Sequence, residues 1–544
     1  MDIASPCSID VETTGVKRED TADPRRAKFV CAAVAPHGIV TFSIPKVLPG
    51  ANVCVHNMPY DAVVLGAWDV NWDDTKILAH IGGHPDTTLK GLQTRLLGRP
   101  ALHHDEAEER GQVPEYNLYD AINTWDLRPV LYDGLKPETR ALYDTLERPL
   151  LPLWAKMTME GSFNLDTPAL QAYRTALAED TEGALSKAEA LLPRGRIVSH
   201  CTKCDLLRER MEKGQKCGDG ENHSWAVPEF DPDLALNLNS PDQLLAAFTD
   251  MGLGVRDTGV DTLRLIAHRH PGVRALLDYR TLFKELSTYV EPFLRIAESG
   301  RRLGAVWRPT GTWAGGRVAS AYPNLMNVPV DLERFFLAPE DGYELLTCDN
   351  STLEVRIAAH VSQDPVLLEA CRGGDFHSVM QETLGLPNRA ATKVAVFGTL
   401  YLGGPAVILE QAQKYNVPMT WAEAQRLHDH VHATLPVYFR WAYQVSEELQ
   451  GMGLFGLTIN VPLGEEKHMQ RAAVNARIQP PAGLVTKYQM LALWRVGYWV
   501  VRQVHDSVTV AVPRAALADA RVEVPRIMEG AAPELDVPIK VEVK

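Results

Sequence analysis

The sequence contains no long apolar run, no leader-like segment and few cysteines. No uninterrupted apolar stretch is long enough to span a bilayer, and the first residues lack the basic and then apolar pattern of a secretory signal. Only 8 cysteines occur in 544 residues, which argues against a disulfide framework and indicates a reducing compartment. Internal repeats and low-complexity tails are absent as well. We therefore expect a globular protein located in the cytoplasm.

Cationic residues are outnumbered by acidic ones. The chain has 55 Lys and Arg against 69 Asp and Glu, which gives a formal net charge of −14. This balance does not exclude a polyanionic partner, because net charge says nothing about local fields. Residues 263–302 hold eight Lys or Arg against four acids and have helical periodicity. That stretch is either a solvated amphipathic face or a surface that binds backbone phosphates.

Length and composition indicate several domains. The chain exceeds what one hydrophobic core holds, and its 45% hydrophobic and 23% charged residues are typical of globular proteins. Short strands and helices alternate over residues 1–135, with an acidic loop at 103–111. Residues 136–303 are mostly helical apart from a polar, Cys-containing segment at 193–228. Mixed strands and helices follow, so the expected fold class is α/β in several domains.

Two aspartates stand where predicted strands end. Asp349 closes the apolar run that starts at Tyr343, and a helix begins near Thr352. Asp506 lies in the polar turn between two β-rich runs over residues 500–510, which predicts a hairpin. Two carboxylates brought together at strand ends can bridge a pair of magnesium ions, which in-line attack at phosphorus requires. The pair predicts nucleotidyl transfer.

A predicted helix between these aspartates carries residues suited to a nucleotide. Arg389, Lys393 and Phe397 are four residues apart and therefore line one helical face. Two cations suit a triphosphate, and an aromatic ring suits a base or a sugar. The alternative interpretation is an ordinary helix with surface cations and one core aromatic.

Acidic residues also recur within the first 120 positions. Asp10 and Glu12 share one face of a strand because strand side chains alternate. Asp61 follows an apolar strand, and Tyr116 and Asp120 have helical i, i+4 spacing. Four carboxylates and a tyrosine can hold two metal ions and orient a water for phosphodiester hydrolysis. The alternative is a set of solvated acids at the ends of strands and helices.

The polar segment at 193–228 has the ligand spacing of a tetrahedral zinc site. Its candidate ligands are Cys201, Cys204, Cys217 and His223, with His200 as a competing ligand. A bound metal would explain how so polar a segment stays ordered. The alternative is three free thiols in a loop. We expect the remaining cysteines in the core: Cys7, Cys31, Cys54, Cys348 and Cys371.

Taken together, these motifs resemble those of family A DNA polymerases, the class of bacterial DNA polymerase I and many phage replicative enzymes. The polymerase motifs are matched at residues 310–329, 349–356, 375–377, 389–401, 471–479 and 505–507. The N-terminal acids resemble those of the family's 3′–5′ proofreading exonuclease. The resemblance implies a template-directed DNA polymerase that extends a primer 3′ end with deoxynucleoside triphosphates and proofreads its product.

The resemblance also implies a role for each matched residue. The exonuclease metal ligands are Asp10, Glu12, Asp61 and Asp120, with Tyr116 positioning the attacking water. The polymerase metal ligands are Asp349 and Asp506. Nucleotide binding falls to Arg389, Lys393, Phe397, Tyr401, His377 and Glu354; Lys393 protonates pyrophosphate and Glu354 blocks a ribose 2′-hydroxyl. DNA binding falls to Arg317, His505, and Asn475 and Gln479 one turn apart on a helix that the prolines at 480–481 break early.

The implied fold is an RNase H-like exonuclease joined to a right hand of palm, thumb and fingers. The expected domains are the exonuclease at 1–135, a helical thumb at 136–303 with the insert at 193–228, the palm at 304–374 and 466–544, and the fingers at 375–465. The implied cofactor is Mg²⁺, two ions in each active site, and structural Zn²⁺ is a candidate for the insert.

The expected partners are primer–template DNA, deoxynucleoside triphosphates and candidate processivity or replisome proteins, with no membrane. Compact size and unusual motif variants favour a bacteriophage enzyme working in the cytoplasm of its bacterial host. Two alternatives stay open. One is a 3′–5′ exonuclease whose polymerase half only binds DNA, and the other is a non-catalytic DNA-binding replication factor.

Overall fold

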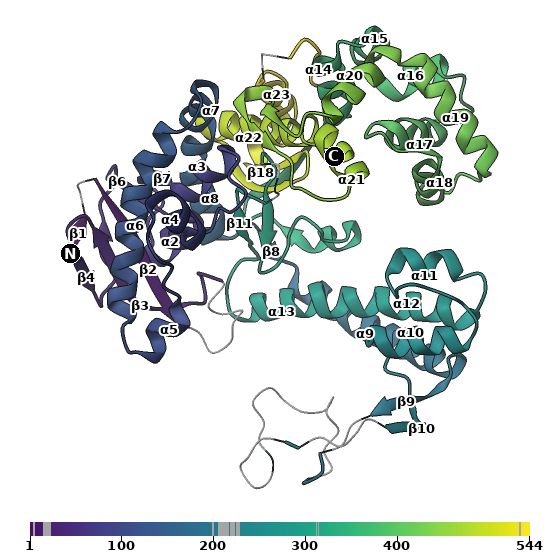
Figure 1. Ribbon diagram of the computed structural model, residues 1–544, viewed down its shortest axis with the longest axis horizontal. Helices are drawn as coiled ribbons and strands as arrows, with labels where there is room; N and C mark the ends of the chain where they lie inside the picture. Colours follow the sequence, from purple (N-terminus) through teal and green to yellow (C-terminus); the bar gives the residue numbers. More distant parts are fainter. Residues whose placement is uncertain are drawn as a thin grey trace. The chain divides into compact units, whose positions relative to one another are not determined.

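The computed structural model describes residues 1–3, 6–14, 23–198, 201–204, 217, 223–224, 229–311, 313, 315–532 and 535–544, and Figure 1 shows its helices and strands. The chain divides into two compact units. Unit 1 comprises Met1–Asn164, Arg301–Val328 and Phe336–Lys544, and unit 2 comprises Leu165–Gly300 and Pro329–Phe335. Among the described helices, none has the length and apolarity needed to cross a membrane.

The N-terminal part of unit 1 is built on a five-stranded sheet in the order β4-β3-β2-β6-β7. Strand β2 pairs antiparallel with β3 and parallel with β6. Along β2, Ile9 and Val11 are buried while Asp10 and Glu12 are half-buried on the opposite face. The strands are β2 (Cys7–Thr14), β3 (Lys28–Ala35), β4 (Ile39–Thr41), β6 (Asn52–Val55) and β7 (Asn71–Asp74), beside the parallel pair β1 (Asp2–Ile3) and β5 (Lys46–Val47).

Helix α6 (Val113–Asp133) packs against β2 and β3 of this sheet. The contact is close because Ala121 of the helix meets Ala33 and Ala35 of the strand. The prediction of an acidic loop at 103–111 is wrong, because these residues contain a short helix in which Ala107 is buried. Acidic side chains lie in its first turn, where the helix dipole favours negative charge. The other helices here are α2 (Met58–Leu65), α3 (Thr75–Ile81), α4 (Leu89–Leu97) and α5 (His104–Glu109).

A second sheet of unit 1 has the order β17-β18-β14-β19 and is antiparallel throughout. The predicted hairpin is confirmed, because β17 turns at residues 505–506 and returns as β18. Helices α22 and α23 pack on this sheet and against each other. The elements are β14 (Tyr343–Asn350), β17 (Trp499–Val504), β18 (Ser507–Pro513), β19 (Val541–Val543), α22 (Gln479–Arg495) and α23 (Leu517–Glu529).

A cluster of helices between β14 and β17 shares one hydrophobic core. Several begin at a capping side chain that accepts first-turn N–H groups, as Asp364, Asp375 and Asn388 do. The helices are α14 (Leu353–Ser362), α15 (Pro365–Arg372), α16 (Phe376–Thr383), α17 (Arg389–Thr399), α18 (Pro405–Lys414), α19 (Trp421–Thr434) and α20 (Pro436–Ser446). The mixture of sheets and helices in unit 1 confirms the α/β class.

One predicted helix is two helices. Asn475 ends α21 (Glu466–Asn475) and Gln479 begins α22, so the two side chains do not share a helix. The break falls before Pro480 because proline lacks an N–H and is tolerated in a first helical turn, where no intrahelical acceptor is needed. The expected interruption is therefore real, but it lies between Asn475 and Gln479.

The remaining elements of unit 1 connect these parts. They are α7 (Pro137–Leu142), the π-helix η1 (Tyr143–Glu147), α8 (Arg148–Glu160), β11 (Val306–Arg308), β12 (Ala319–Ala321), β13 (Phe336–Leu337), β15 (Gln450–Met452), η5 (Leu454–Gly456), β16 (Thr458–Asn460) and η6 (Arg514–Ala516). The antiparallel pair β11 and β12 precedes β14 in the chain and carries the segment around Arg317.

Unit 2 is mostly helical, with its own core around Phe248, Leu263 and Leu276. Its longest helix, α9, packs against α12. The elements are α9 (Thr167–Leu191), β9 (Arg194–Val198), β10 (Glu229–Ala235), α10 (Pro241–Asp250), α11 (Val260–Ile266), α12 (Pro271–Glu285), η3 (Leu286–Val290), α13 (Glu291–Glu298) and η4 (Val330–Phe335). Strands β9 and β10 pair antiparallel and bracket the Cys/His segment.

Candidate functional site

The first acidic site consists of Asp10, Glu12, Asp61 and Asp120. Strand β2 supplies the first two residues, α2 the third and α6 the fourth. Carboxylate oxygens of Asp10, Glu12 and Asp120 all lie within 4.8 Å of one another. Asp61 is buried and does not share that spacing, although its charge raises the pKa of Asp10. Clustered hard oxygen donors of this kind fit a divalent cation such as Mg²⁺.

Burial and mutual repulsion raise the pKa of these carboxyls. For Glu12, burial and then the charge of Asp120 raise the pKa to about 7. Burial is also the largest cause for Asp10, followed by Asp120, Glu12 and Asp61. A bound cation would relieve this repulsion, because it favours the ionised form of each carboxyl.

Three side chains that the sequence analysis did not single out contact the carboxylates of the first acidic site. Lys90 of α4 forms an ion pair with Asp120, and its ammonium lies 4.3 Å from the centre of the Tyr116 ring. Asn117 donates from Nδ2 to Asp10 at 2.6 Å, and His104 Nε2 lies 3.5 Å from a Glu12 oxygen. Asn117 follows Tyr116 directly and was open to prediction from that position, whereas Lys90 carries no local signal.

The second acidic site consists of Asp349 and Asp506. Asp349 is the seventh residue of β14 and pairs across the sheet with Ser507, the residue after Asp506. The turn is tied to β14 by Asn350, whose backbone N donates to the Asp506 carbonyl at 3.2 Å and whose Nδ2 donates to the same oxygen at 2.6 Å. Asn350 also exchanges two hydrogen bonds of 2.7 Å with Gln489 of α22. The two aspartates are therefore fixed at one end of the sheet.

Electrostatics at the second acidic site resemble those of the first. Burial, followed by the charge of Asp349, raises the pKa of Asp506 to about 6. Lys544 Nζ lies 3.0 Å from Asp349 Oδ1, a contact that the sequence did not reveal. Asp349 therefore forms an ion pair with the ammonium group of Lys544.

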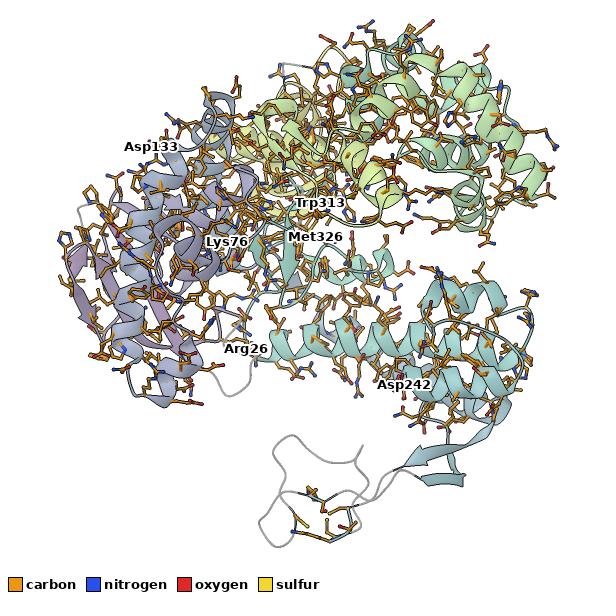
Figure 2. The ribbon with its side chains drawn as sticks, viewed as in Figure 1. Arg26, Lys76, Asp133, Asp242, Trp313 and Met326 are labelled. Atoms are coloured by element: carbon orange, nitrogen blue, oxygen red, sulfur yellow. The ribbon has the colours of Figure 1, made fainter. Side chains whose placement is uncertain are left out.

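A cavity of about 420 Å³ opens beside Asp506. Among its lining residues are Arg317, Glu354, His505 and Asp506, all predicted site residues, and Met326, which Figure 2 labels. Glu354 is held by both of its oxygens, since Arg317 Nη2 donates to Oε1 at 2.5 Å and the Tyr401 hydroxyl donates to Oε2. The structure therefore fixes the Glu354 side chain at the edge of this cavity.

Helix α17 carries the predicted nucleotide-binding residues on the face that is not buried. Arg389 is exposed and forms an ion pair with Asp375. Lys393 is half-buried, with its ammonium 5.8 Å from the centre of the Tyr415 ring. No residue of α17 lines the cavity beside Asp506.

His377 packs beside the predicted aromatic of α17. Its ring centre lies 6.3 Å from that of Phe397. Burial, followed by the charges of Arg389 and Lys393, lowers the pKa of His377 to about 4, so the ring is neutral near pH 7. Its Nδ1 is buried, without a hydrogen-bond partner among the described residues. A neutral imidazole carries its proton on either nitrogen, so this orphaned nitrogen can donate to or accept from a ligand.

The four predicted Cys/His ligands also converge. One ligand atom from each of Cys201, Cys204, Cys217 and His223 lies within 4.8 Å of the others. The competing ligand His200 lies outside the described residues. All five other cysteines are buried, as expected.

Comparison with known proteins identifies the family. The family model "DNA polymerase family A" matches residues 221–544. DNA polymerase I, thermostable, from Thermus filiformis is 30% identical over an alignment of 501 residues that covers 84% of this chain and 54% of that protein. DNA polymerase I from Deinococcus radiodurans is 28% identical over an alignment of 515 residues that covers 87% of this chain and 47% of that protein. The chain belongs to DNA polymerase family A, and it spans about half the length of the curated relatives it matches.

A solved structure supports the same fold. The POL domain of Pol1 from M. smegmatis, in complex with DNA primer-template and dNTP, matches with a TM-score of 0.75. The match covers 99% of this chain and 94% of that chain at 21% sequence identity. At this identity the likeness establishes the fold.

Proposed function

We propose that this protein is a template-directed DNA polymerase that extends a primer 3′ end with deoxynucleoside triphosphates and proofreads with a 3′–5′ exonuclease. We assign the exonuclease to residues 1–135 and synthesis to the remainder. Membership of the family supports the polymerase. The observation that carries the proposal is the convergence of Asp349 and Asp506 at one end of the β14–β18 sheet, beside a cavity lined by Arg317 and Glu354.

The second acidic site and the residues that line the cavity beside it would have different roles in nucleotidyl transfer. Asp349 and Asp506 would hold the Mg²⁺ ions, which when bound stabilise charge on the attacking and leaving oxygens. Glu354, fixed by Arg317 and Tyr401, would fill the space that a ribose 2′-hydroxyl needs. Arg317 would also contact the primer–template, and His505 the primer end.

The α16 and α17 residues would bind the incoming triphosphate. Arg389 and Lys393 offer two cations on the unburied face of α17, and His377 offers an orphaned ring nitrogen beside Phe397. Lys393 would give its proton to the departing pyrophosphate. Phe397 would pack on the nucleotide sugar and base, and Asn475 and Gln479 would contact template and primer.

The first acidic site would remove mispaired ends. Asp10, Glu12, Asp61 and Asp120 would hold Mg²⁺, and Tyr116 would position the water that attacks the terminal phosphodiester. Lys90 and Asn117 keep Asp120 and Asp10 in place through their direct contacts. A frayed primer end would reach this site as a single strand.

Primer extension and degradation with point variants test the proposal. A 5′-labelled primer–template with Mg²⁺ is incubated with or without the four deoxynucleotides. Asp349→Ala should abolish extension and keep degradation, and Asp10→Ala should keep extension and abolish degradation. The exposed acids Asp341 and Asp69 provide matched controls, because Asp341→Ala and Asp69→Ala remove a carboxylate away from either site.

The outcomes separate the proposal from its alternatives. Degradation without extension in the wild-type protein would favour an exonuclease whose polymerase half only binds DNA. Loss of both activities in the wild type would favour a non-catalytic DNA-binding replication factor. Processivity or replisome proteins remain candidate partners, and a pull-down from host extract would identify them.

A further inference from the structure

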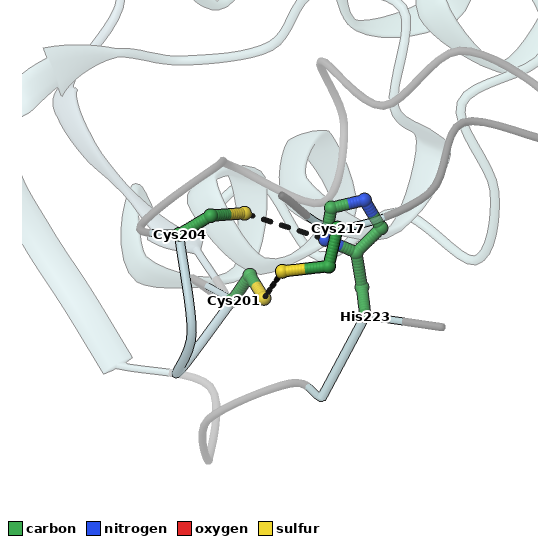
Figure 3. Close-up of side chains that lie close together, drawn as sticks. All are labelled: Cys201, Cys204, Cys217 and His223. Atoms are coloured by element: carbon green, nitrogen blue, oxygen red, sulfur yellow. Dashed lines mark hydrogen bonds between the residues drawn. The ribbon is translucent and has the colours of Figure 1, made fainter. Parts of the chain in front are cut away.

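The Cys/His segment of unit 2 has the geometry of a metal centre. Cys201 Sγ lies 3.9 Å from Cys217 Sγ, and Cys204 Sγ lies 3.5 Å from His223 Nδ1, as Figure 3 shows. Tetrahedral Zn²⁺, with bonds of about 2.3 Å to sulfur and about 2.0–2.1 Å to nitrogen, places two sulfurs about 3.8 Å apart and a sulfur and a nitrogen about 3.5 Å apart. Both measured distances match the edges of that tetrahedron.

Neither a disulfide nor a set of free thiols accounts for all four residues. A disulfide between Cys201 and Cys217 requires sulfurs about 2.05 Å apart and gives Cys204 and His223 no role. Free thiols in a loop have no reason to converge with an imidazole to within 4.8 Å. Thiolate and imidazole donors select Zn²⁺ over Mg²⁺, which prefers oxygen.

We infer that Cys201, Cys204, Cys217 and His223 bind one Zn²⁺ through three thiolates and Nδ1 of the imidazole, and that this ion cross-links the insert of unit 2. The four protein ligands close the tetrahedron, so the site is structural rather than catalytic. Binding releases the thiol protons to solvent, and the resulting centre carries a single net negative charge.

The position of the ligands explains what the ion does. They come from two stretches, 201–204 and 217–223, which both lie between β9 and β10. The hydrophobic core of unit 2 includes Leu192 and Leu236, and none of the residues described between them, the four ligands among these, belongs to it. The ion would supply the cross-link that a core supplies elsewhere, and its loss should leave the α9–α12 core intact.

Metal analysis of the full-length protein tests this inference. After expression with zinc and dialysis against metal-free buffer, mass spectrometry of the metals should find about one Zn²⁺ per chain, and below about 0.1 in Cys201→Ser/Cys217→Ser. His223→Ala should lose the ion while His200→Ala keeps it. Cys204→His should retain the metal, because it replaces one zinc ligand with another.

Two further measurements cover variants that fold poorly. Co²⁺ added to the stripped wild-type protein should give a thiolate-to-cobalt charge-transfer band that saturates at one equivalent. Chelation should expose the insert to limited proteolysis while the thermal unfolding of the rest of the chain is unchanged, and added Zn²⁺ should restore protection. The inference is overturned if the wild-type protein neither retains Zn²⁺ nor takes up one Co²⁺, or if the double serine variant keeps its metal.

Discussion

Glu147 and Lys487 form an ion pair that is almost sealed from solvent. Lys487 Nζ lies 2.6 Å from Glu147 Oε1, and both side chains are 1% exposed. The same ammonium donates to the Pro309 carbonyl at 3.2 Å. Removing two charges from water is costly, so each ion tolerates burial only because the other is present. The pair joins the end of η1 to α22 across 340 positions of the chain.

Lys487→Met should destabilise the protein by about 3–5 kcal/mol, because it leaves the Glu147 carboxylate buried and uncompensated. The melting temperature of unit 1 at neutral pH is the measurement. Glu147→Gln/Lys487→Met should recover much of the loss, since both charges are then gone. Lys467→Met, at an exposed position, serves as the control and should stay within about 0.5 kcal/mol. Equal melting temperatures for the single and double variants would contradict this account.

Asp506→Asn should stabilise the metal-free protein at neutral pH while abolishing synthesis. The folded protein raises the pKa of Asp506 from its ordinary value of 3.8 to about 6, so folding favours the protonated form. The ionised Asp506 carboxylate therefore lowers the free energy of unfolding. This penalty is absent at low pH, grows as pH rises from about 4 to about 6, and stays constant above that range. Because one pKa unit corresponds to about 1.4 kcal/mol, removing the Asp506 carboxylate should stabilise the folded protein by about 3 kcal/mol above pH 6.

Melting curves in chelator at pH 4 to 8 measure this effect. The variant should melt higher than wild type at pH 8 and converge with it near pH 4. Asp341→Asn, an exposed acid before β14, is the matched control and should follow wild type at every pH. A constant difference across the range would show that Asp506 titration does not contribute.

At the element scale, the strand patterns predicted more than the helix patterns. The apolar run ending at Asp349 is a strand whose burial alternates toward its end, and the runs around Asp506 are a hairpin whose two strands are buried over most of their length. The prediction of one helix through Asn475 and Gln479 was wrong, because the prolines at 480–481 lie in the first turn of a new helix. Proline is favoured in a first turn and also occurs just after a helix ends, so its position alone does not distinguish a start from a stop.

The ion-pair partners of the site residues could not be predicted from local sequence patterns. Lys90 meets Asp120 and Lys544 meets Asp349 only because separate elements converge in three dimensions. No spacing rule connects residues so far apart. Spacing did place His223 with the three cysteines, because a metal site confines its ligands to short loops.

Gly316→Ala should displace the Arg317 segment and reduce primer extension at least about tenfold, a loss of about 1.4 kcal/mol in transition-state stabilisation. Gly316 has φ +70°, and a Cβ there would lie 2.2 Å from the Pro480 carbonyl oxygen, which is backbone and cannot rotate away. The shift should break the Arg317–Glu354 contact. Exonuclease activity should be unchanged.

Gly342→Ala separates steric clash from backbone strain. Gly342 has φ +83°, but nothing lies within 4 Å of the place that a Cβ would take, so its variant meets only the strain of a left-handed backbone. Steady-state extension and degradation rates of both variants are the measurement. Equal losses of extension in the two variants would exclude the Pro480 contact as the cause.

At the scale of the whole molecule, this acidic chain contains a locally cationic stretch, because residues 263–302 hold eight Lys or Arg against four acids. Carboxylates at the two sites contribute to the net charge of −14. The cations of residues 263–302 do not all face solvent, because Arg280 is half-buried and donates to the Leu238 and Thr258 carbonyls, whereas Arg269 is exposed although it donates to the Leu253 carbonyl. Composition predicted the cationic stretch, but only the fold separates half-buried arginines from exposed ones.

Arg274 and Lys284 are exposed on α12, and their joint replacement by alanine should weaken DNA binding in a salt-dependent way. Each phosphate contact contributes about −0.9 to the slope of log K against log[salt], so losing two should flatten the slope by about two. Fluorescence anisotropy with labelled primer–template over a salt series gives both slopes. Arg280→Ala is the contrast on the same helix, because it should lower the melting temperature of unit 2 and leave the salt slope unchanged. An unchanged slope in the double variant would assign this stretch to a solvated amphipathic face.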